Sequence, residues 1–244
     1  MSEGKKKVIT NKIYIQSYRP SKNSSNNDGD DSNLMIDGSS FRIAADCSMQ
    51  SDIKYANILI LINISMKYEN HLNERIFSSL NQVGISSGYI TVHLYISDYD
   101  SENLNHFVVD VSLTLNKILD MYQEYNNVII VGYDLSTWLA QQIVMRRPEV
   151  THYVLLSPCV KKLDFSFSHP SLASGLIIHP EQDTINMVKY VQEYIDKLQK
   201  CKNEDVTIEY MPIKGADHFF RNADSLKNLE IVFAYYLRKN IKLI

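Results

Sequence analysis

From residue 57 onward, short apolar runs alternate with segments in which apolar residues recur every three or four positions. The six runs are Asn57–Ile64, Tyr89–Tyr95, Asn127–Gly132, His152–Ser157, Gly175–His179 and Val206–Pro212. Runs of this kind suit strands that are buried on both faces, as in a parallel sheet. The segments between and after them predict amphipathic helices over Asn73–Gln82, His106–Tyr122, Leu135–Arg146, Asn186–Gln199 and Ser225–Lys239. Strand–helix alternation repeated this often predicts a doubly wound α/β sheet with right-handed crossovers.

The N-terminal part of the chain has a different pattern. Val8–Gln16 predicts a strand and Leu34–Ala45 predicts one or two more, which together would form an antiparallel edge of the sheet. Residues 21–33 are polar and nearly devoid of apolar side chains, so they predict a long, flexible exposed loop. With no internal repeat and no second linker, residues 1–244 are predicted to form a single domain.

Charge and cysteine content exclude several classes of protein. The 25 Lys and Arg residues against 28 Asp and Glu give a net charge of −3, with no basic excess to bind nucleic acid. Cys47, Cys159 and Cys201 are odd in number and lack metal-ligand spacing, which argues against disulfides or zinc and favours a reducing, cytoplasmic compartment. The N-terminus lacks the apolar core of a signal peptide, and Ile58–Ile62 is too short to cross a bilayer. We therefore expect no membrane association and no cofactor.

Three loops follow strands of the predicted sheet, where sites in such folds lie. In Gly132-Tyr133-Asp134-Leu135-Ser136 a buried run passes directly into a helix, with small residues two positions before and after Asp134, as in a nucleophile elbow. Asp183 lies a few residues beyond the run that ends at His179, and His218 follows the last run. Elbow, acid and histidine occur in the order that α/β-hydrolases use.

On these residues the chain resembles the α/β-hydrolase superfamily, and in particular small bacterial serine hydrolases that lack a large cap. The resemblance spans roughly residues 127–239. Its segments are Met-Arg-Arg-Pro-Glu at 145–149, Asp-Phe-Ser-Phe at 164–167, Gln-Asp at 182–183 and Gly-Ala-Asp-His-Phe-Phe at 215–220. The resemblance implies an α/β-hydrolase fold, with Asp183 at the position of the catalytic acid and His218 at that of the base.

The chain departs from the serine-hydrolase pattern at the elbow and in two loops. The nucleophilic serine corresponds to Asp134 and the second elbow glycine to Ser136. The loop that lends an oxyanion N–H group, rich in His, Pro and Gly in the family, corresponds to Asn63–Asn70, which has no glycine. The family's Arg-Gly loop corresponds to Ser97–Tyr99. A carboxylate that attacks an ester gives an anhydride that reverts, so serine-esterase chemistry is not expected.

Three hypotheses follow from Asp134, Asp183 and His218. In the first, the protein is a divergent, non-catalytic relative. The two carboxylates flank His218, favour its charged form and stabilise the turn. The pocket then binds a small molecule, or the chain serves as a partner subunit. In the second, Asp134 is the nucleophile, His218 the base and Asp183 the orienting acid, as in epoxide hydrolases and haloalkane dehalogenases. Those enzymes carry a cap, and only about twenty residues separate the strands near Leu156 and Leu176. In the third, the three side chains hold a metal ion, although nothing in the sequence defines its geometry.

The other candidate residues have structural interpretations. His179 is the nearest of the remaining histidines to the site, and we interpret it as a buried structural histidine. Cys159, which follows a strand, is predicted to be an inert thiol. Trp138, on the first turn of the elbow helix, is predicted to pack rather than to bind a ligand.

Overall fold

The computed structural model describes residues 7–20, 38–50, 56–64, 70–96, 104–168 and 171–240. The strands are β1 (Val8–Pro20), β2 (Gly38–Gln50), β3 (Ala56–Ile64), β4 (Ile90–Ile96), β5 (Tyr125–Tyr133), β6 (His152–Leu156), β7 (Ser174–Pro180) and β8 (Ile208–Ile213). The helices are α1 (Asn70–Ser86), α2 (Leu104–Met121), α3 (Ser136–Val144), α4 (Val188–Cys201) and α5 (Ala223–Lys239). The predicted loop at 21–33 lies outside the described residues.

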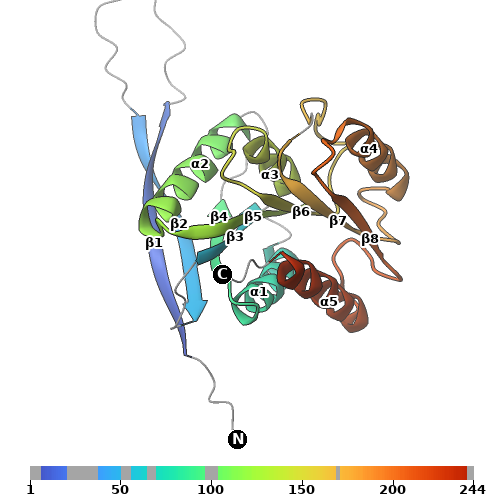
Figure 1. Cartoon of the computed structure of the whole chain (residues 1–244), viewed down its shortest axis with the longest axis horizontal. Helices are drawn as coiled ribbons and strands as arrows, with labels where there is room; N and C mark the ends of the chain where they lie inside the picture. Colours follow the sequence, from blue (N-terminus) through green and yellow to red (C-terminus); the bar gives the residue numbers. More distant parts are fainter. Residues whose placement is uncertain are drawn as a thin grey trace, which may run out of the picture.

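The strands form one mostly parallel sheet in the order β1-β2-β4-β3-β5-β6-β7-β8. Strand β2 pairs antiparallel with both β1 and β4. The six strands β4, β3, β5, β6, β7 and β8 pair parallel with one another in that order. This arrangement confirms the predicted α/β-hydrolase fold with an antiparallel N-terminal edge. In Figure 1 the β1–β2 pair stands at one side of the molecule, with β1 outermost.

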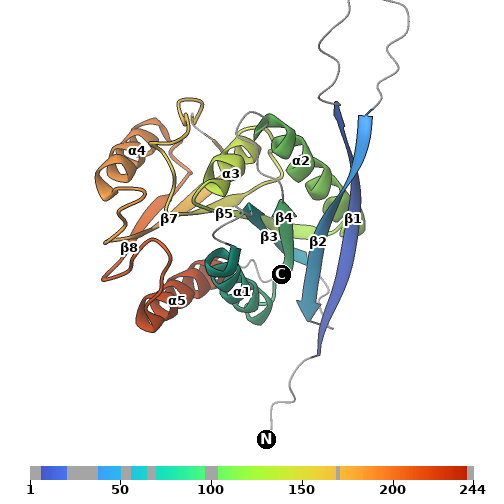
Figure 2. The same ribbon diagram turned by 180° about the vertical axis from the view of Figure 1, so that it is seen from behind.

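Helices cover both faces of the sheet. Figures 1 and 2 show α1 and α5 together on one face and α2, α3 and α4 on the other. Strand β3 separates the two layers: its Ile58, Ile60 and Ile62 belong to one apolar cluster, and its Leu59 and Leu61 belong to the other. All five side chains are fully buried. The unbroken apolar run in the sequence is therefore the signature of a strand with a core on each side.

The parallel strands end together at the edge of the sheet that carries the elbow. Strand β5 leads into α3 there, and the loops after β6, β7 and β8 reach the same edge. Between β6 and β7, the described residues 157–168 and 171–173 form turns and bends only, which confirms that no cap domain is inserted at this point. Among the described helices, none combines the length and the apolarity that a membrane crossing requires.

Candidate functional site

The elbow places Asp134 at the apex of a tight strand–turn–helix. Asp134 adopts a left-handed backbone conformation with φ of 48°, and its N–H donates to the carbonyl oxygen of Leu156 at 3.0 Å. A Cβ atom on Gly132 would lie 2.5 Å from the carbonyl oxygen of Ser136, so only glycine allows α3 to start this close to β5. A non-glycine residue in this conformation costs about 1–3 kcal/mol and is typical of functional turns.

Ser136, at the position of the second elbow glycine, braces the turn. Its buried Oγ accepts a hydrogen bond from the Tyr133 N–H at 2.8 Å and donates to the Tyr133 carbonyl at 2.9 Å. The neighbouring Thr137 hydroxyl donates to the Asp134 carbonyl oxygen. Both hydroxyls therefore serve the backbone of the elbow and do not replace the missing serine at its apex.

The loops after β7 and β8 bring together the predicted acid and histidine. Nδ1 of His218 lies 2.8 Å from Oδ2 of Asp183, and both residues are buried. The other oxygen of Asp183 accepts the backbone N–H groups of Ile185 and Asn186, each at 2.8 Å. Burial alone would raise the pKa of Asp183, but hydrogen bonds from His218 and Ser157 outweigh it and hold that pKa below its usual range. Asp183 is thus an anchored, ionised partner for His218.

Ser157 is a third member of this group, and it is not among the site residues predicted from the sequence. It follows β6 with a φ of 45°, and its buried Oγ donates to Oδ2 of Asp183 and lies 3.1 Å from Nδ1 of His218. A small polar residue at the carboxyl end of a central strand, next to the elbow strand, was the available signal. Ser157 steadies the acid–histidine pair from the β6 side.

Asn186 joins the elbow to the acid–histidine pair. Its side-chain Nδ2 donates to Oδ1 of Asp134 at 2.7 Å, to the Ser157 carbonyl at 2.8 Å and to Ser157 Oγ at 3.2 Å. Its backbone N–H meanwhile binds Asp183. Asn186 lies two residues before α4, and sequence reasoning recognised it only as the start of a helix. We call Asp134, Ser157, Asp183, Asn186 and His218 the polar cluster.

The carboxylate of Asp134 contacts the side chains of Asn186 and Lys162. Lys162 Nζ lies 3.4 Å from Oδ1 of Asp134. Among the described residues, no ion pair joins Asp134 to His218, so the expectation that two carboxylates flank the imidazole is wrong: one does. The reason is that Asn186 and Lys162 both bind the same oxygen of Asp134, whereas Asp183 is the carboxylate bound at Nδ1 of His218. The three predicted residues share one network, linked through Asn186 and Ser157.

The residues interpreted as structural are buried or packed. His179 is fully buried, and its ring nitrogens have no hydrogen-bond partner among the described residues. Burial lowers the pKa of His179 to about 4, although the charge of Asp183 acts in the opposite direction. Burial also raises the pKa of the Cys159 thiol to about 12, helped by the charge of Asp134, which fits an inert thiol. The Trp138 indole N–H donates to the Asp164 carbonyl, and its ring packs edge-on to Phe167.

The segments at 65–69 and 97–103, where the family's oxyanion and Arg-Gly loops would fall, lie outside the described residues. Within the part of the chain that is described, no group of three or more His, Cys, Asp and Glu side chains is arranged to hold a metal ion. The hypothesis of a metal site at Asp134, Asp183 and His218 thus gains no support from geometry.

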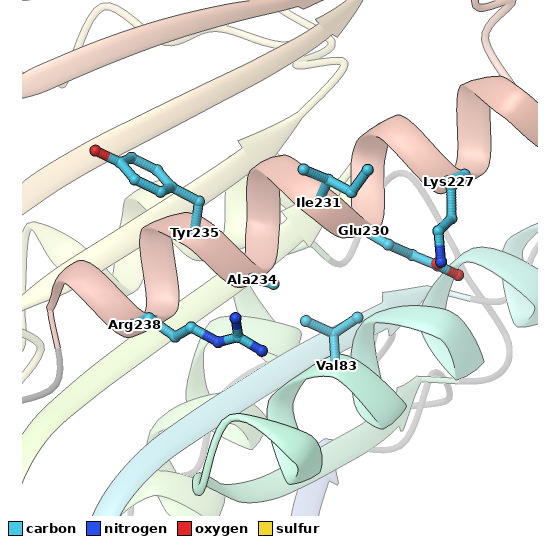
Figure 3. Close-up of a pocket in the computed structure, with 7 residues that line it drawn as sticks. All are labelled: Val83, Lys227, Glu230, Ile231, Ala234, Tyr235 and Arg238. Atoms are coloured by element: carbon cyan, nitrogen blue, oxygen red, sulfur yellow. The ribbon is translucent and has the colours of Figure 1, made fainter.

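A surface groove elsewhere is separate from this site. It has a volume of about 460 Å³ and lies between α1 and α5 on the opposite face from α3 and α4 (Figures 1 and 3). Its lining residues are Val83, Lys227, Glu230, Ile231, Ala234, Tyr235 and Arg238. Figure 3 shows Val83 of α1 facing the α5 side chains across the groove. The groove shares no residue with the polar cluster.

Sequence comparison finds one distant relative. No family model matches the chain. An uncharacterised protein of Rickettsia prowazekii (strain Madrid E) is 29% identical over 174 residues, which are 68% of this chain and 73% of that protein. Because this relative is itself uncharacterised, the similarity does not indicate a function.

Structural comparison finds α/β hydrolases. A protein of unknown function from Agrobacterium tumefaciens matches 81% of this chain and 91% of its own, with a TM-score of 0.70 and 23% identity. A serine hydrolase homologue from Coxiella burnetii matches 80% and 92%, with a TM-score of 0.68 and 16% identity. A serine hydrolase without a lid from Xanthomonas campestris matches 82% and 91%, with a TM-score of 0.66 and 13% identity. The chain therefore has the α/β-hydrolase fold, and its structural neighbours include a serine hydrolase without a lid.

Proposed function

We propose that this protein is a non-catalytic α/β-hydrolase-fold protein that binds a small molecule at the carboxyl edge of its sheet without forming an acyl-enzyme. The observation that carries the proposal is the carboxylate at the apex of the elbow, held at 2.7 Å by Asn186 and at 3.4 Å by Lys162. An acyl-transfer site needs at this point a hydroxyl or thiol that a histidine can deprotonate. Asp134 supplies neither.

The hydroxyls near the apex do not take over this role. Ser157 contacts His218, but it does so at Nδ1, the nitrogen that also binds Asp183, and its side chain is fully buried. The hydroxyls of Ser136 and Thr137 are bound to backbone atoms of the elbow. In a serine hydrolase the acid holds one ring nitrogen of the histidine and the nucleophile meets the other. The contacts of Ser136, Thr137 and Ser157 therefore do not support a role for any of these hydroxyls as the nucleophile in place of Asp134.

The proposal is tested by activity and by ligand binding. Purified protein is incubated with short acyl esters and with a fluorophosphonate probe, and we expect neither turnover nor labelling. A panel of metabolites is then screened by thermal unfolding, and we expect a compound that raises the unfolding temperature and is recovered unchanged. Robust ester turnover or labelling of the wild type would overturn the proposal, as would a stabilising compound that is consumed.

A second candidate function is supported by the strained conformation of Asp134 together with the His218–Asp183 pair. In an Asp-nucleophile hydrolase, a carboxylate oxygen attacks an sp³ carbon, a halide leaves or an epoxide C–O bond opens, and an alkyl ester forms on the enzyme. A water deprotonated by the histidine then cleaves that ester and restores the carboxylate. Asp134 would be the nucleophile, His218 the base and Asp183 its orienting acid.

Intact mass distinguishes this candidate from the first. After incubation, an Asp-nucleophile enzyme gains the mass of the whole epoxide, or of the alkyl group of a haloalkane whose halide has left, and Asp134→Asn does not. Asp196→Asn is the matched control because Asp196 is exposed on α4 and its side chain binds only Gln192 among the described residues. A wild type that shows no adduct and consumes no epoxide or haloalkane, like Asp134→Asn, removes this candidate.

A further inference from the structure

Strand β1 leaves one edge of the sheet open. It is the terminal strand of the sheet and pairs with β2 over all 13 of its residues. In an antiparallel ladder about half of the backbone N–H and C=O groups of an edge strand point away from its neighbour. Within the described part of the chain, nothing pairs with these outward groups of β1. Both views show β1 on the outside of the molecule (Figures 1 and 2).

The opposite edge of the sheet, strand β8, has features that disfavour pairing with another strand. Strand β8 has only six residues, and one of them is Pro212, which has no N–H to donate. Glu209 of β8 is paired with Lys239 of α5 at 2.8 Å. Short edge strands, proline and charge are the usual devices that prevent strands from associating at an edge. By contrast, the stretch Val8–Ile15 of β1 contains no proline, and Lys12 is its one charged side chain.

The side chains of this stretch are apolar and accessible. Val8 is 45% exposed, Ile9 39% and Tyr14 60%, whereas Ile13 and Ile15 are buried in the core cluster that α2 also joins. The two faces of β1 therefore differ: the odd-numbered positions face the α2 layer, and the even-numbered positions Val8, Thr10, Lys12 and Tyr14 lie on the other face. Any strand added at this edge must respect that difference.

We propose that β1 is a homodimerisation edge, where it pairs antiparallel with β1 of a second copy of this chain. A twofold axis perpendicular to the sheet reverses the strand direction and keeps the α2 face of both copies on the same side. Residues that lie directly opposite must then come from the same face. The interface is isologous, as in most homodimers, and joins the two sheets into one.

The sequence of β1 selects one register for this pairing. With Asn11 opposite Asn11 of the second copy, Ile9 lies opposite Ile13, Val8 opposite Tyr14 and Thr10 opposite Lys12. Between Val8 and Tyr14 each apolar side chain then meets an apolar one, and Lys12 meets a hydroxyl, while Ile15 lies beyond this stretch, level with Lys7. A shift that centres the pair on Lys12 places two like charges directly opposite each other, which is destabilising. A shift toward Thr10 places Val8 opposite Lys12. Self-complementarity in this one register is the reason that we assign the edge to a second copy.

The test is the molar mass of the full-length protein measured by light scattering over a wide range of concentration. We expect the wild type to reach twice the mass of one chain. The double variant Val8→Lys with Tyr14→Lys places like charges opposite each other at two points of the interface, and we expect a twofold lower mass at the same concentration. The double variant Val8→Lys with Tyr14→Glu places opposite charges there, and we expect the dimer to return.

Leu172→Lys is the matched control, because Leu172 is 81% exposed and lies in the turn before β7. It changes an exposed apolar residue to lysine outside β1 and is expected to leave the dimer intact. Circular dichroism and urea unfolding establish that each variant is folded. A wild type that stays monomeric, or a dimer that Val8→Lys with Tyr14→Lys leaves unchanged, overturns the proposal. Failure of Val8→Lys with Tyr14→Glu to restore the dimer overturns the proposed register.

Discussion

The side-chain amide of Asn186 donates a hydrogen bond of 2.7 Å to the carboxylate of Asp134. Along the chain the two residues are separated by α3, β6, β7 and their loops, and this contact joins the elbow to the segment just before α4. The same amide binds the carbonyl and the hydroxyl of Ser157. One side chain thus holds together three loops at the carboxyl edge of the sheet.

Replacing Asn186 should lower stability more than its size suggests. Asn186→Ala leaves the partly buried Asp134 carboxylate and the buried Ser157 carbonyl without this donor, and each such loss costs about 1–3 kcal/mol. We expect the free energy of unfolding in urea to fall by about 2–4 kcal/mol. Asn203→Ala is the control, since Asn203 is exposed and makes one long bond to Ser171. Equal losses in the two variants would show that the Asn186 network contributes little.

A second prediction concerns the glycine that shapes the elbow. In Gly132→Ala the new methyl group would lie 2.5 Å from the Ser136 carbonyl oxygen and 2.7 Å from the Thr137 nitrogen, which are backbone atoms that cannot turn aside. We expect a loss of about 3 kcal/mol or more in the free energy of unfolding.

Gly88→Ala separates crowding from backbone strain. Gly88 has a positive φ of 83°, and a Cβ atom there would meet nothing within 4 Å. Its expected cost is the strain alone, about 1–2 kcal/mol. If Gly88→Ala proves as destabilising as Gly132→Ala, the close approach of α3 to β5 does not explain the elbow glycine.

Sequence reasoning was sufficient for the fold because burial on two faces leaves a clear pattern. The apolar run at 57–64 became β3, whose side chains alternate between two cores. Chain order and the positions of strand ends also led to Asp183 and His218, which lie 2.8 Å apart. Small differences remain at element ends: β2 begins at Gly38 and extends to Gln50, beyond the predicted Ala45.

The inner organisation of the site could not be predicted in the same way. Ser157 and Asn186 are ordinary residues in the sequence, and their role depends on which loops meet in three dimensions. The direction of the Asp134 carboxylate is also a tertiary property, since it is decided by whether His218 or Asn186 offers the nearer donor. Hydrogen-bond partners of this kind leave no periodic signal along the chain.

Stability should fall as the pH drops from neutral toward 4. Burial lowers the pKa of His93 and of His179 from 6.5 to about 4, so the unfolded chain takes up protons that the folded chain does not. The stabilisation is complete above pH 6.5 and is lost progressively as the pH falls to about 4, by at most roughly 3 kcal/mol for each histidine. Asp183, whose pKa is lowered, adds a loss at still lower pH.

This pH dependence can be checked by urea unfolding between pH 7 and pH 4. The His93 ring stacks on Phe77 at 5.3 Å, so His93→Phe should retain the packing and remove one titrating group. We expect the fall in stability to be about halved in that variant. A wild type whose free energy of unfolding is constant across this range would show that these histidines are accessible to protons in the folded state.

Asp134→Ser tests whether the remaining parts of the site can work with a hydroxyl at the apex. The variant keeps the left-handed turn, which Gly132 and Ser136 hold in place, and the His218–Asp183 pair. We expect Asp134→Ser to react with a fluorophosphonate probe and Asp134→Ser with His218→Ala not to react, because deprotonation of the hydroxyl requires the imidazole. Ester turnover should stay low, since the loss of one oxyanion donor alone costs about 10²–10³ in rate. Absence of labelling in the single variant would mean that His218 is not aligned with the apex of the elbow.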